Sequence, residues 1–337
     1  MKPLVSILIP AFNAENYIAE AITSAVDQTW ARTEVIVVDD GSTDRTLAIA
    51  MQFASRGVTA VTQAHAGAAA ARNRAFSLSR GDYIQWLDAD DLLGPAKIER
   101  QLAALEESPS ARTLLSGSWA TFLSRQSRAS FQPTPLWQDL APVEWLRLKM
   151  SHNIFMQTGA WLVSRELTEA AGPWDTTLQV DDDGEYFCRV LLCCDAVRFV
   201  AEAQTFYRIS PTTRLSYIGR SYGKMESQFR STQMHIGYLR SLEDSDRIRT
   251  ACIRHLQNML INFFPERIDL VTQAEHMAAQ LGGRLEVPPR LSWKYSWIGR
   301  LFGQSLAKQA HLFLPEIRWS LLRFWDRALR SFERSLT

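Results

Sequence analysis

One short stretch constrains this chain more than any other. Residues 83–87 are largely apolar and aromatic, and three aspartates follow within four positions. An apolar run of this kind predicts a buried strand. Asp88, Asp90 and Asp91 then crowd like charges at its end, so we expect a cation beside them, and carboxylate oxygens suit Mg²⁺ or Mn²⁺. The alternative is an acidic turn that merely leaves the strand, because residues 91–95 have a turn-like composition.

Strand-like apolar runs alternate with helical segments in the first third of the chain. Expected strands cover residues 5–9, 34–38 and 58–61, and expected helices cover residues 18–26, 43–53 and 66–79. Asn13 is the expected cap of the first helix, and Ser42 or Thr43 that of the second. Such alternation with short turns predicts an α/β fold with a mostly parallel sheet and helices on both faces.

The predicted strands end in polar, acidic sequences. Residues 10–13, 39–42 and 88–91 bring one phenylalanine and five aspartates to a single edge of the sheet. Parallel sheets bind ligands at that edge. The absence of G-x-G-x-x-G after the first strand, and of any G-x-x-x-x-G-K-[ST] loop, argues against a dinucleotide-binding fold and a P-loop NTPase. A phosphate bound here would then need a metal ion to neutralise it.

The composition is typical of a soluble globular protein. The 337 residues carry a net charge of +1, which gives no general reason to expect nucleic acid as a partner. The four cysteines lack a C-x-x-C spacing, so buried thiols in a reducing cytoplasm are expected. We expect no signal peptide, and no uncharged apolar run reaches the length of about 18 residues that a membrane span requires. The six histidines form no H-x-x-x-H pair, so zinc chemistry is not expected.

Four ordered motifs resemble those of family-2 glycosyltransferases of GT-A fold. They are residues 5–13, 37–44, 71–73 and 88–91, and their order and separations agree over residues 4–115. The resemblance implies a nucleotide-sugar donor, a divalent cation (Mn²⁺ or Mg²⁺) and, for most members, inversion at the anomeric carbon. UDP is the default nucleotide because the family uses it most often.

The resemblance also implies roles for individual residues. Phe12 would lie against the nucleobase and Asp40 would contact its polar edge, although simple packing is an alternative for Phe12. Arg72 would lie near the ribose and phosphates, unless it is a surface charge of its helix. Asp90 would bind the metal, with Asp88 on the ribose or in the water shell of the metal. The donor-binding set is Pro10, Ala11, Phe12, Asp40, Arg72, Asp88 and Ala89, and the metal set is Asp90 and Asp88.

A second acidic run resembles the family's Glu-Asp pair, which opens a helix that runs to an arginine. Registering that arginine on Arg189 makes Asp183 the general base, which would remove the proton of the acceptor hydroxyl. Because Asp181 and Asp182 precede it, the alignment of this run with the family's pair could shift by one residue. Acids at a helix N-terminus can also be purely structural, because they interact favourably with the helix dipole.

The sequence departs from the family pattern at two positions. Gly184 stands where the family prefers an aromatic residue, and Ser210 stands where many members carry a metal-ligating histidine. A hydroxyl is a poorer ligand than an imidazole, so water and phosphate would have to complete the metal site.

The chain divides into three expected regions. Residues 1–115 are the nucleotide-sugar-binding half, residues 116–218 the acceptor and base half, and residues 219–337 a helical extension. From residue 290 onward, nine Arg/Lys against three acids are interleaved with aromatic residues. Helices of that composition bind anionic membrane interfaces, and a helical bundle covering the catalytic domain is the alternative. The expected location is the cytoplasm, either free or peripheral on the inner face of the cell membrane.

These features predict an inverting, metal-dependent glycosyltransferase of hexosyltransferase type, with a polysaccharide, cell-surface or lipid-linked acceptor. A nucleotidyltransferase would share the sheet and the metal, but residues 10–13 are not the glycine-rich basic loop that such enzymes carry after the first strand. The other alternative is a catalytically silent relative that binds a nucleotide or a membrane partner, which Gly184 and Ser210 leave open.

Overall fold

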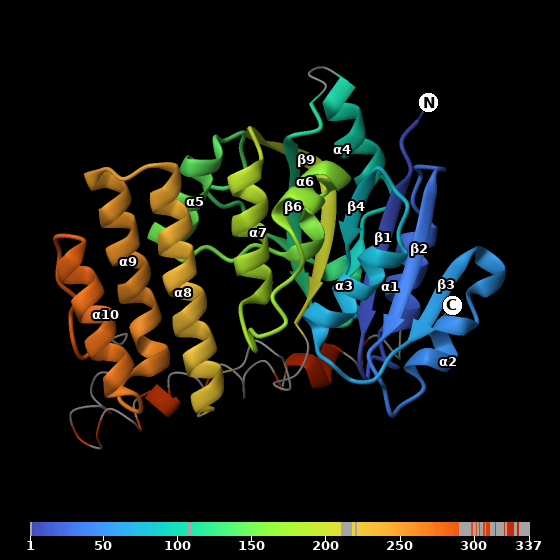
Figure 1. Cartoon of the computed structure of the whole chain (residues 1–337). Helices are drawn as coiled ribbons and strands as arrows, with labels where there is room; N and C mark the ends of the chain where they lie inside the picture. The colour runs from blue at the N-terminus through green and yellow to red at the C-terminus, as the bar shows by residue number, and fades with distance from the viewer. Residues whose placement is uncertain are drawn as a thin grey trace.

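The computed structural model describes residues 2–106, 110–209, 218–219 and 221–289, together with scattered residues after position 297. Two sheets stand side by side in the middle of the molecule and helices cover them (Figure 1). Three long helices of the extension form the end of the molecule opposite β3 (Val58–Thr62). They are α8 (Tyr222–Leu242), α9 (Asp246–Phe263) and α10 (Ile268–Gln280).

The first sheet contains the four strands that the sequence predicts. Its order is β3-β2-β1-β4-β8, in which β3, β2, β1 and β4 are parallel and β8 joins β4 antiparallel. The further strands are β1 (Val5–Ala11), β2 (Thr33–Asp39), β4 (Tyr83–Trp86) and β8 (Val163–Ser164). The predicted α/β fold with a mostly parallel sheet is therefore confirmed for this sheet.

Burial on both faces explains the uninterrupted apolar sequence of β1. Ile7 and Ile9 pack in one core cluster, and Leu8 packs in the cluster on the opposite face. Successive strand residues point to opposite faces, so a strand covered on both faces needs apolar residues at every position. The helices on the Ile7 face are α1 (Ile18–Val26), α2 (Thr46–Met51) and α4 (Lys97–Glu106), and those that pack in the cluster on the Leu8 face include α3 (Ala68–Leu78).

The predicted helix caps are wrong, because the capping residues join two loops at the sheet edge. Helix α1 begins at Ile18 and helix α2 at Thr46, several residues after the expected caps. Asn13 has a φ of 48°, and its Oδ1 accepts a hydrogen bond from the Thr43 amide at 2.9 Å. Ser42 Oγ accepts one from the Asn13 amide at 2.9 Å. The loops that follow β1 and β2 are thus fixed to each other.

The second sheet has the order β5-β9-β6-β7 and is mixed. β5 (Leu92–Leu93) and β7 (Ser130–Phe131) are short edge strands, whereas β6 (Thr113–Phe122) and β9 (Ala196–Arg208) form a long parallel pair. β5 directly follows the aspartates of residues 88–91 and pairs antiparallel with the end of β9. This pairing brings the end of β9 beside the predicted metal site.

One apolar core runs from the first sheet into the extension, so the two parts are packed as one body. It includes Trp86 of β4, Phe229 of α8 and Leu256 of α9. Among the described residues, none of the helices combines the length and the apolarity needed to cross a bilayer. The remaining helices are α5 (Pro142–His152), α6 (Arg165–Ala171), α7 (Asp182–Cys193) and three single 3-10 turns, η1 (Ala54–Arg56), η2 (Gln126–Arg128) and η3 (Thr158–Ala160). The boundaries of the three expected regions stay a prediction.

Candidate active site

An exposed aromatic ring stands at the end of β1. Pro10 and Ala11 are buried in the strand, whereas the next residue, Phe12, is 46% exposed. The Phe12 ring stacks on the imidazole of His65, with 4.3 Å between the ring centroids and 27° between the planes. The stack leaves Phe12 exposed beside the loop after β2, where its ring can contact a planar base. His65 was not among the residues predicted for the site.

Asp40 organises the loop that carries His65. Its carboxylate is buried and accepts hydrogen bonds from the Ala66 amide at 3.0 Å, the Gly67 amide at 2.8 Å and Gln63 Nε2 at 2.7 Å. His65 Nδ1 lies 2.9 Å from the second carboxylate oxygen. A carboxylate has about four acceptor positions, and the loop occupies them. The predicted contact between Asp40 and a base would therefore have to replace one of these partners.

The three aspartates after β4 have different environments. Asp88 and Asp90 are partly exposed, as is Ala89 between them, whereas Asp91 is fully buried. Asp91 accepts hydrogen bonds from Gln157 Nε2 at 2.7 Å and from the Arg208 amide at 2.8 Å. Burial, with the nearby charges of Asp90 and Asp88, raises the pKa of Asp91 well above its usual range. Asp91 therefore stabilises the turn of residues 88–91 through buried hydrogen bonds.

Arg208 of β9 holds the same turn from the side. Its Nε donates to the Asp90 carbonyl oxygen at 2.7 Å, and its Nη2 donates to Glu20 Oε2 at 2.8 Å. The guanidinium lies over the rings of Tyr17 and Phe122, with its central carbon 5.1 Å and 4.4 Å from their centroids. Sequence reasoning missed Arg208, which lies two residues before Ser210, the position compared with the family's metal-ligating histidine.

Asp88 and Asp90 offer the kind of ligand that a hard divalent cation takes. Both provide carboxylate oxygens at the carboxyl end of β4, on a turn fixed by Asp91 and Arg208. In the part of the chain that the structure describes, no three His, Cys, Asp or Glu side chains converge as a metal site. The residues thus fit a cation that takes its other ligands from a diphosphate and water. Ser210 lies outside the described residues.

Arg72 joins the two acidic runs. It projects from α3 and is buried, so the alternative of a surface charge is wrong. Its Nη2 donates to Asp88 Oδ1 and its Nη1 to Asp182 Oδ2, both at 2.8 Å, and the guanidinium lies 4.3 Å from a ring centroid of Trp174. Burial lowers the pKa of Arg72, but the two carboxylates outweigh this effect and the pKa is raised. A permanent cation therefore stands between the predicted donor side and the predicted base.

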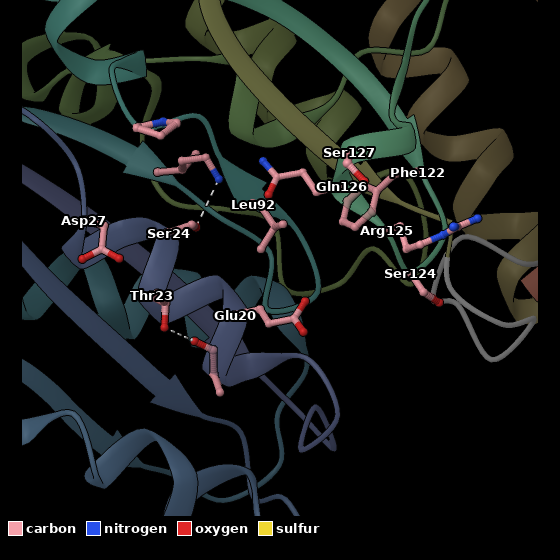
Figure 2. Close-up of a pocket in the computed structure, with 13 residues that line it drawn as sticks. Glu20, Thr23, Ser24, Asp27, Leu92, Phe122, Ser124, Arg125, Gln126 and Ser127 are labelled. Carbon is pink, nitrogen blue, oxygen red and sulfur yellow. Dashed lines mark hydrogen bonds between the residues drawn. The ribbon is translucent and has the colours of Figure 1, made fainter. Parts of the chain in front are cut away.

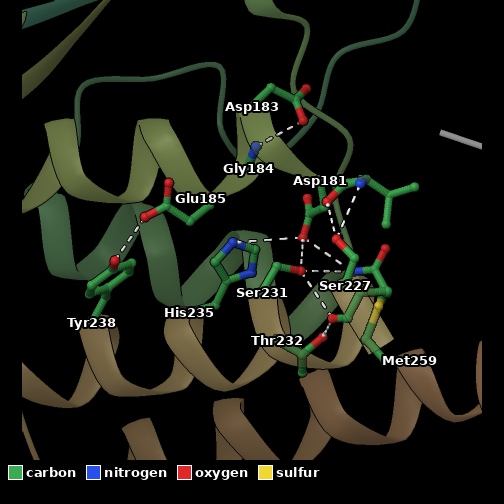
Figure 3. A network of polar contacts seen from close by, with 12 residues as sticks. Asp181, Asp183, Gly184, Glu185, Ser227, Ser231, Thr232, His235, Tyr238 and Met259 are labelled. Atoms are coloured by element: carbon green, nitrogen blue, oxygen red, sulfur yellow. Dashed lines mark hydrogen bonds and ion pairs between the residues drawn. The ribbon is translucent and has the colours of Figure 1, made fainter. Parts of the chain in front are cut away.

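The first aspartate of the second run points away from the site. Asp181 has a φ of 60°, a left-handed conformation that turns its side chain toward α8 (Figure 3). Its Oδ2 accepts hydrogen bonds from Ser231 Oγ at 2.7 Å and Gln228 Nε2 at 3.1 Å, and lies 3.8 Å from His235 Nε2. Gly184 is explained by this geometry, because a Cβ at residue 184 would overlap Asp181 Oδ1. The departure from the family's aromatic residue thus has a structural cause.

Asp183 has the weakest side-chain contacts of the three aspartates. Its Oδ1 accepts from the Gly184 amide at 2.8 Å, and its Oδ2 lies 3.5 Å from Thr158 Oγ1. Figure 3 shows Asp183 directed away from α8, opposite to Asp181. Burial raises the pKa of Asp183 to about 7, with the charges of Asp182 and Asp181 adding to the effect. A carboxylate with this pKa suits the exchange of protons near neutral pH.

A separate cavity of about 630 Å³ is lined by Leu92 and Leu93, which directly follow the turn of residues 88–91 (Figure 2). It runs between α1, β5 and η2, and its wall includes Glu20, the partner of Arg208. None of the residues predicted for the donor, metal or base lines it. Its lining residues are Ala19, Glu20, Thr23, Ser24, Asp27, Leu92, Leu93, Pro95, Phe122, Ser124, Arg125, Gln126 and Ser127.

The sequence has relatives among curated glycosyltransferases. The profile of glycosyl transferase family 2 matches residues 6–170. An uncharacterised glycosyltransferase of Rickettsia typhi is 42% identical over 106 residues, which cover 32% of this chain and 33% of that protein. EpsJ of Bacillus subtilis, also an uncharacterised glycosyltransferase, is 29% identical over 221 residues and covers 63% of both chains. TuaG of Bacillus subtilis, provisionally named a teichuronic acid biosynthesis glycosyltransferase, is 39% identical over 109 residues, 32% of this chain and 43% of that protein. The chain thus spans between 33% and 63% of the length of these relatives.

Solved structures share the fold at low sequence identity. TarS of S. aureus, residues 1–349 in complex with UDP, superposes with a TM-score of 0.61 at 16% identity and covers 82% of this chain and 88% of that one. The mannosyltransferase PcManGT of Pyrobaculum calidifontis, in complex with GDP-Man and Mn²⁺, has a TM-score of 0.52 at 17% identity and covers 96% of this chain and 85% of that one. The matched profile shows that residues 6–170 belong to glycosyl transferase family 2, and the likeness to the solved structures shows the GT-A fold.

Proposed function

We propose that this protein is an inverting glycosyltransferase that moves a sugar from a nucleotide-sugar to an acceptor hydroxyl. One observation carries the proposal: Arg72 binds Asp88 and Asp182 at 2.8 Å each, although these aspartates lie far apart in the sequence. The buried guanidinium of Arg72 therefore lies between Asp88, on the predicted donor side, and Asp182, next to the predicted base. Such a centre suits a reaction in which a diphosphate leaves on one side while a proton is removed on the other.

The donor is a nucleotide-sugar, with UDP as the default nucleotide. The exposed ring of Phe12, supported by His65, offers a face for the base. The names of the neighbouring structures add support, since TarS was solved with UDP and with UDP-GlcNAc, and PcManGT with GDP-Man. The loop of residues 63–67, ordered by Asp40, would enclose the base from the side.

Asp90, with Asp88, would hold a divalent cation, Mn²⁺ or Mg²⁺, on the diphosphate. When bound, the cation neutralises charge that develops on the leaving group. The contribution of the chain itself is to fix the geometry. Arg208 and Asp91 restrain the turn that presents both carboxylates, and Arg72 sets the position of Asp88.

Asp183 is the proposed general base. It would accept the proton of the acceptor hydroxyl while that oxygen forms a bond to the anomeric carbon, and the bond from this carbon to the diphosphate oxygen breaks on the opposite face. One displacement of this kind inverts the anomeric centre. The weak partners of Asp183 support the assignment, because Asp181 and Asp182 are held by α8 and by Arg72.

The proposed acceptor is a growing polysaccharide, a cell-surface glycan or a lipid-linked sugar. Support comes from the provisional name of TuaG, which places that relative in teichuronic acid biosynthesis. The proposed location is cytoplasmic, on the side of the membrane where activated sugars are made.

A donor screen tests the proposal directly. The full chain is incubated with a panel of UDP-, GDP- and dTDP-sugars in Mn²⁺, in Mg²⁺ or in a chelator, and release of the nucleoside diphosphate is measured. We expect one donor to be hydrolysed slowly without acceptor, only when the metal is present, and not by Asp90→Asn. Metal-independent hydrolysis, or equal hydrolysis by Asp90→Asn, would contradict the metal assignment. No release and no calorimetric binding across the panel would reject the activity.

A further inference from the structure

In the described part of the C-terminal segment, charged side chains are buried and large apolar side chains are exposed. The charged side chains point into the protein: Lys308 and Arg323 are buried, and Asp326 is largely so. The apolar side chains point outward, and Phe324 and Trp325 are 68% and 64% exposed. The apolar residues exposed in this way are Leu301, Leu306, Leu314, Leu322, Phe324, Trp325 and Leu329. A helix that covers a domain in water normally has the opposite arrangement.

Polar contacts anchor the segment at two places. Asp326 Oδ2 accepts hydrogen bonds from the Ser124 amide at 2.7 Å and the Arg125 amide at 3.2 Å, and its Oδ1 accepts from Arg125 Nε at 2.7 Å. Lys308 Nζ donates to Glu266 Oε2 at 2.7 Å, close to the start of α10. These buried charged contacts fix which side of the segment faces the protein. The outward direction of the apolar side chains follows from them.

This arrangement bears on the alternative of a helical bundle that covers the catalytic domain. In such a bundle the aromatic residues of the segment would form its core. Phe324 and Trp325 instead contact each other edge to face, with 6.1 Å between their ring centroids, and remain exposed to solvent. Among the described residues, seven of the fourteen exposed large apolar side chains lie in this segment, and such a concentration marks an interaction site.

We infer that the exposed apolar side chains among the described residues of this segment, with Phe324 and Trp325 at their centre, form a docking surface for an anionic lipid bilayer. Charge argues for lipid over a second copy of the chain. The sequence from residue 290 onward carries nine Arg/Lys against three acids, and setting aside Lys308, Arg323 and Asp326, which point inward, leaves seven Arg/Lys against two acids, an excess that would repel a second copy. Exposed tryptophan, phenylalanine and leucine side chains flanked by basic residues match the boundary between acyl chains and anionic headgroups. The surface would lie on the bilayer without crossing it.

The position of this surface relates it to the candidate active site. Ser124 and Arg125, which bind Asp326, follow the end of β6, and the parallel neighbour β9 ends in Arg208 beside Asp90. In Figure 1 the described tail pieces, drawn in red, lie along the edge of the view toward which β1 and β2 point. A bilayer bound there would face the same end of the molecule as the strand ends. The inference does not depend on the proposed transfer reaction.

Flotation of the full chain with vesicles tests the inference. Wild type is compared on vesicles of phosphatidylcholine alone and of equal parts phosphatidylcholine and phosphatidylglycerol. The test variant is Phe324→Ser with Trp325→Ser. The matched control is Met51→Ser with Leu242→Ser, which removes two apolar side chains, 59% and 37% exposed, at the ends of α2 and α8. Circular dichroism and melting temperature check that both variants are folded.

We expect wild type and control to float with the anionic vesicles, and the test variant to bind at least roughly tenfold more weakly. Binding should fall with added salt and be weak on phosphatidylcholine alone. Wild type that stays in solution, equal loss in the control, or equal binding to both vesicle types would each overturn the inference. Light scattering that shows a dimer dissociated by the test variant, without flotation, would assign the surface to a second copy instead.

Discussion

The two acidic runs of this protein, residues 88–91 and 181–183, share a feature that neither sequence shows on its own. In each run one aspartate turns inward and is used as an anchor: Asp91 binds Gln157 and the Arg208 amide, and Asp181 binds Ser231 and Gln228. Another member of each run, Asp88 or Asp182, binds Arg72. A cluster of acids is therefore not a set of equivalent ligands, because burying one of them positions the rest.

The anchors differ in where their partners come from. Asp91 is held by Gln157, just before η3, and by β9, within the two sheets and their connections, whereas Asp181 is held by α8 of the helical extension. The donor side thus has its support inside the α/β region. The predicted base depends on a helix outside it. Changes in the extension should affect sugar transfer more than donor binding.

The largest expected effect is that of Asp183→Asn. Removing the general base should lower kcat for transfer by about 10²–10⁴, while the Kd for the donor nucleotide stays within about twofold. Transfer is measured with the donor found in the screen, and binding by calorimetry. Asp181→Asn and Asp182→Asn are measured in parallel. A larger loss of kcat in either of them, with Asp183→Asn near the wild-type rate, would move the base by one or two residues.

The pH dependence of transfer should report the same group. The pKa of Asp183 is raised to about 7, so kcat should fall by about tenfold per pH unit below that value as the base is protonated. The same group changes the free energy of unfolding in the opposite direction: kcat rises with pH, whereas stability falls. Between its usual pKa and the raised value the folded state binds more protons than the unfolded chain, so this group destabilises the fold as pH rises. Asp183→Asn should therefore gain in melting temperature over wild type at alkaline pH and not at acidic pH. A flat kcat profile through neutrality would contradict the assignment.

On the donor side, Asp91→Ala should act on stability. It leaves Gln157 Nε2 and the Arg208 amide without their acceptor in a buried place, which costs about 1–3 kcal/mol in the free energy of unfolding. Asp90→Ala is the matched control, because Asp90 is partly exposed and its loss should act mainly on metal-dependent donor binding. Chemical denaturation measures the first effect and calorimetry the second. Equal stability of the two variants would show that Asp91 is not an anchor.

The smallest expected effect tests the anchor on α8. Ser231→Ala removes the hydrogen bond to Asp181 and should reduce kcat by a few-fold, in keeping with a loss of about 0.5–1.5 kcal/mol, without a change in donor Kd. Thr232→Val is the control, because this buried hydroxyl on the same helix donates to the Gln228 carbonyl oxygen and not to Asp181. An equal loss in both variants, or a change in donor Kd, would mean that α8 only stabilises the fold.

Local sequence was sufficient for most of the fold and for the edge where the site lies. The strands at residues 5–9, 34–38 and 83–87 were predictable because apolar runs of that length must be buried on both faces, and the polar sequences after them mark the edge of the candidate site. The helix caps were not predictable. Asn13 and Ser42 have capping chemistry, but the loop opposite them offered closer partners.

What the tertiary structure decided is which acid has which neighbour. The sequence alone could not assign roles within residues 181–183, since all three are the same amino acid, and it could not pair Arg72 with Asp182 across 110 positions. Those choices depend on how α3, α7 and α8 pack around one core. Composition and periodicity determine which residues are buried and where strands end, because these are properties of neighbours in the chain. The partner of a buried charge is a property of neighbours in space.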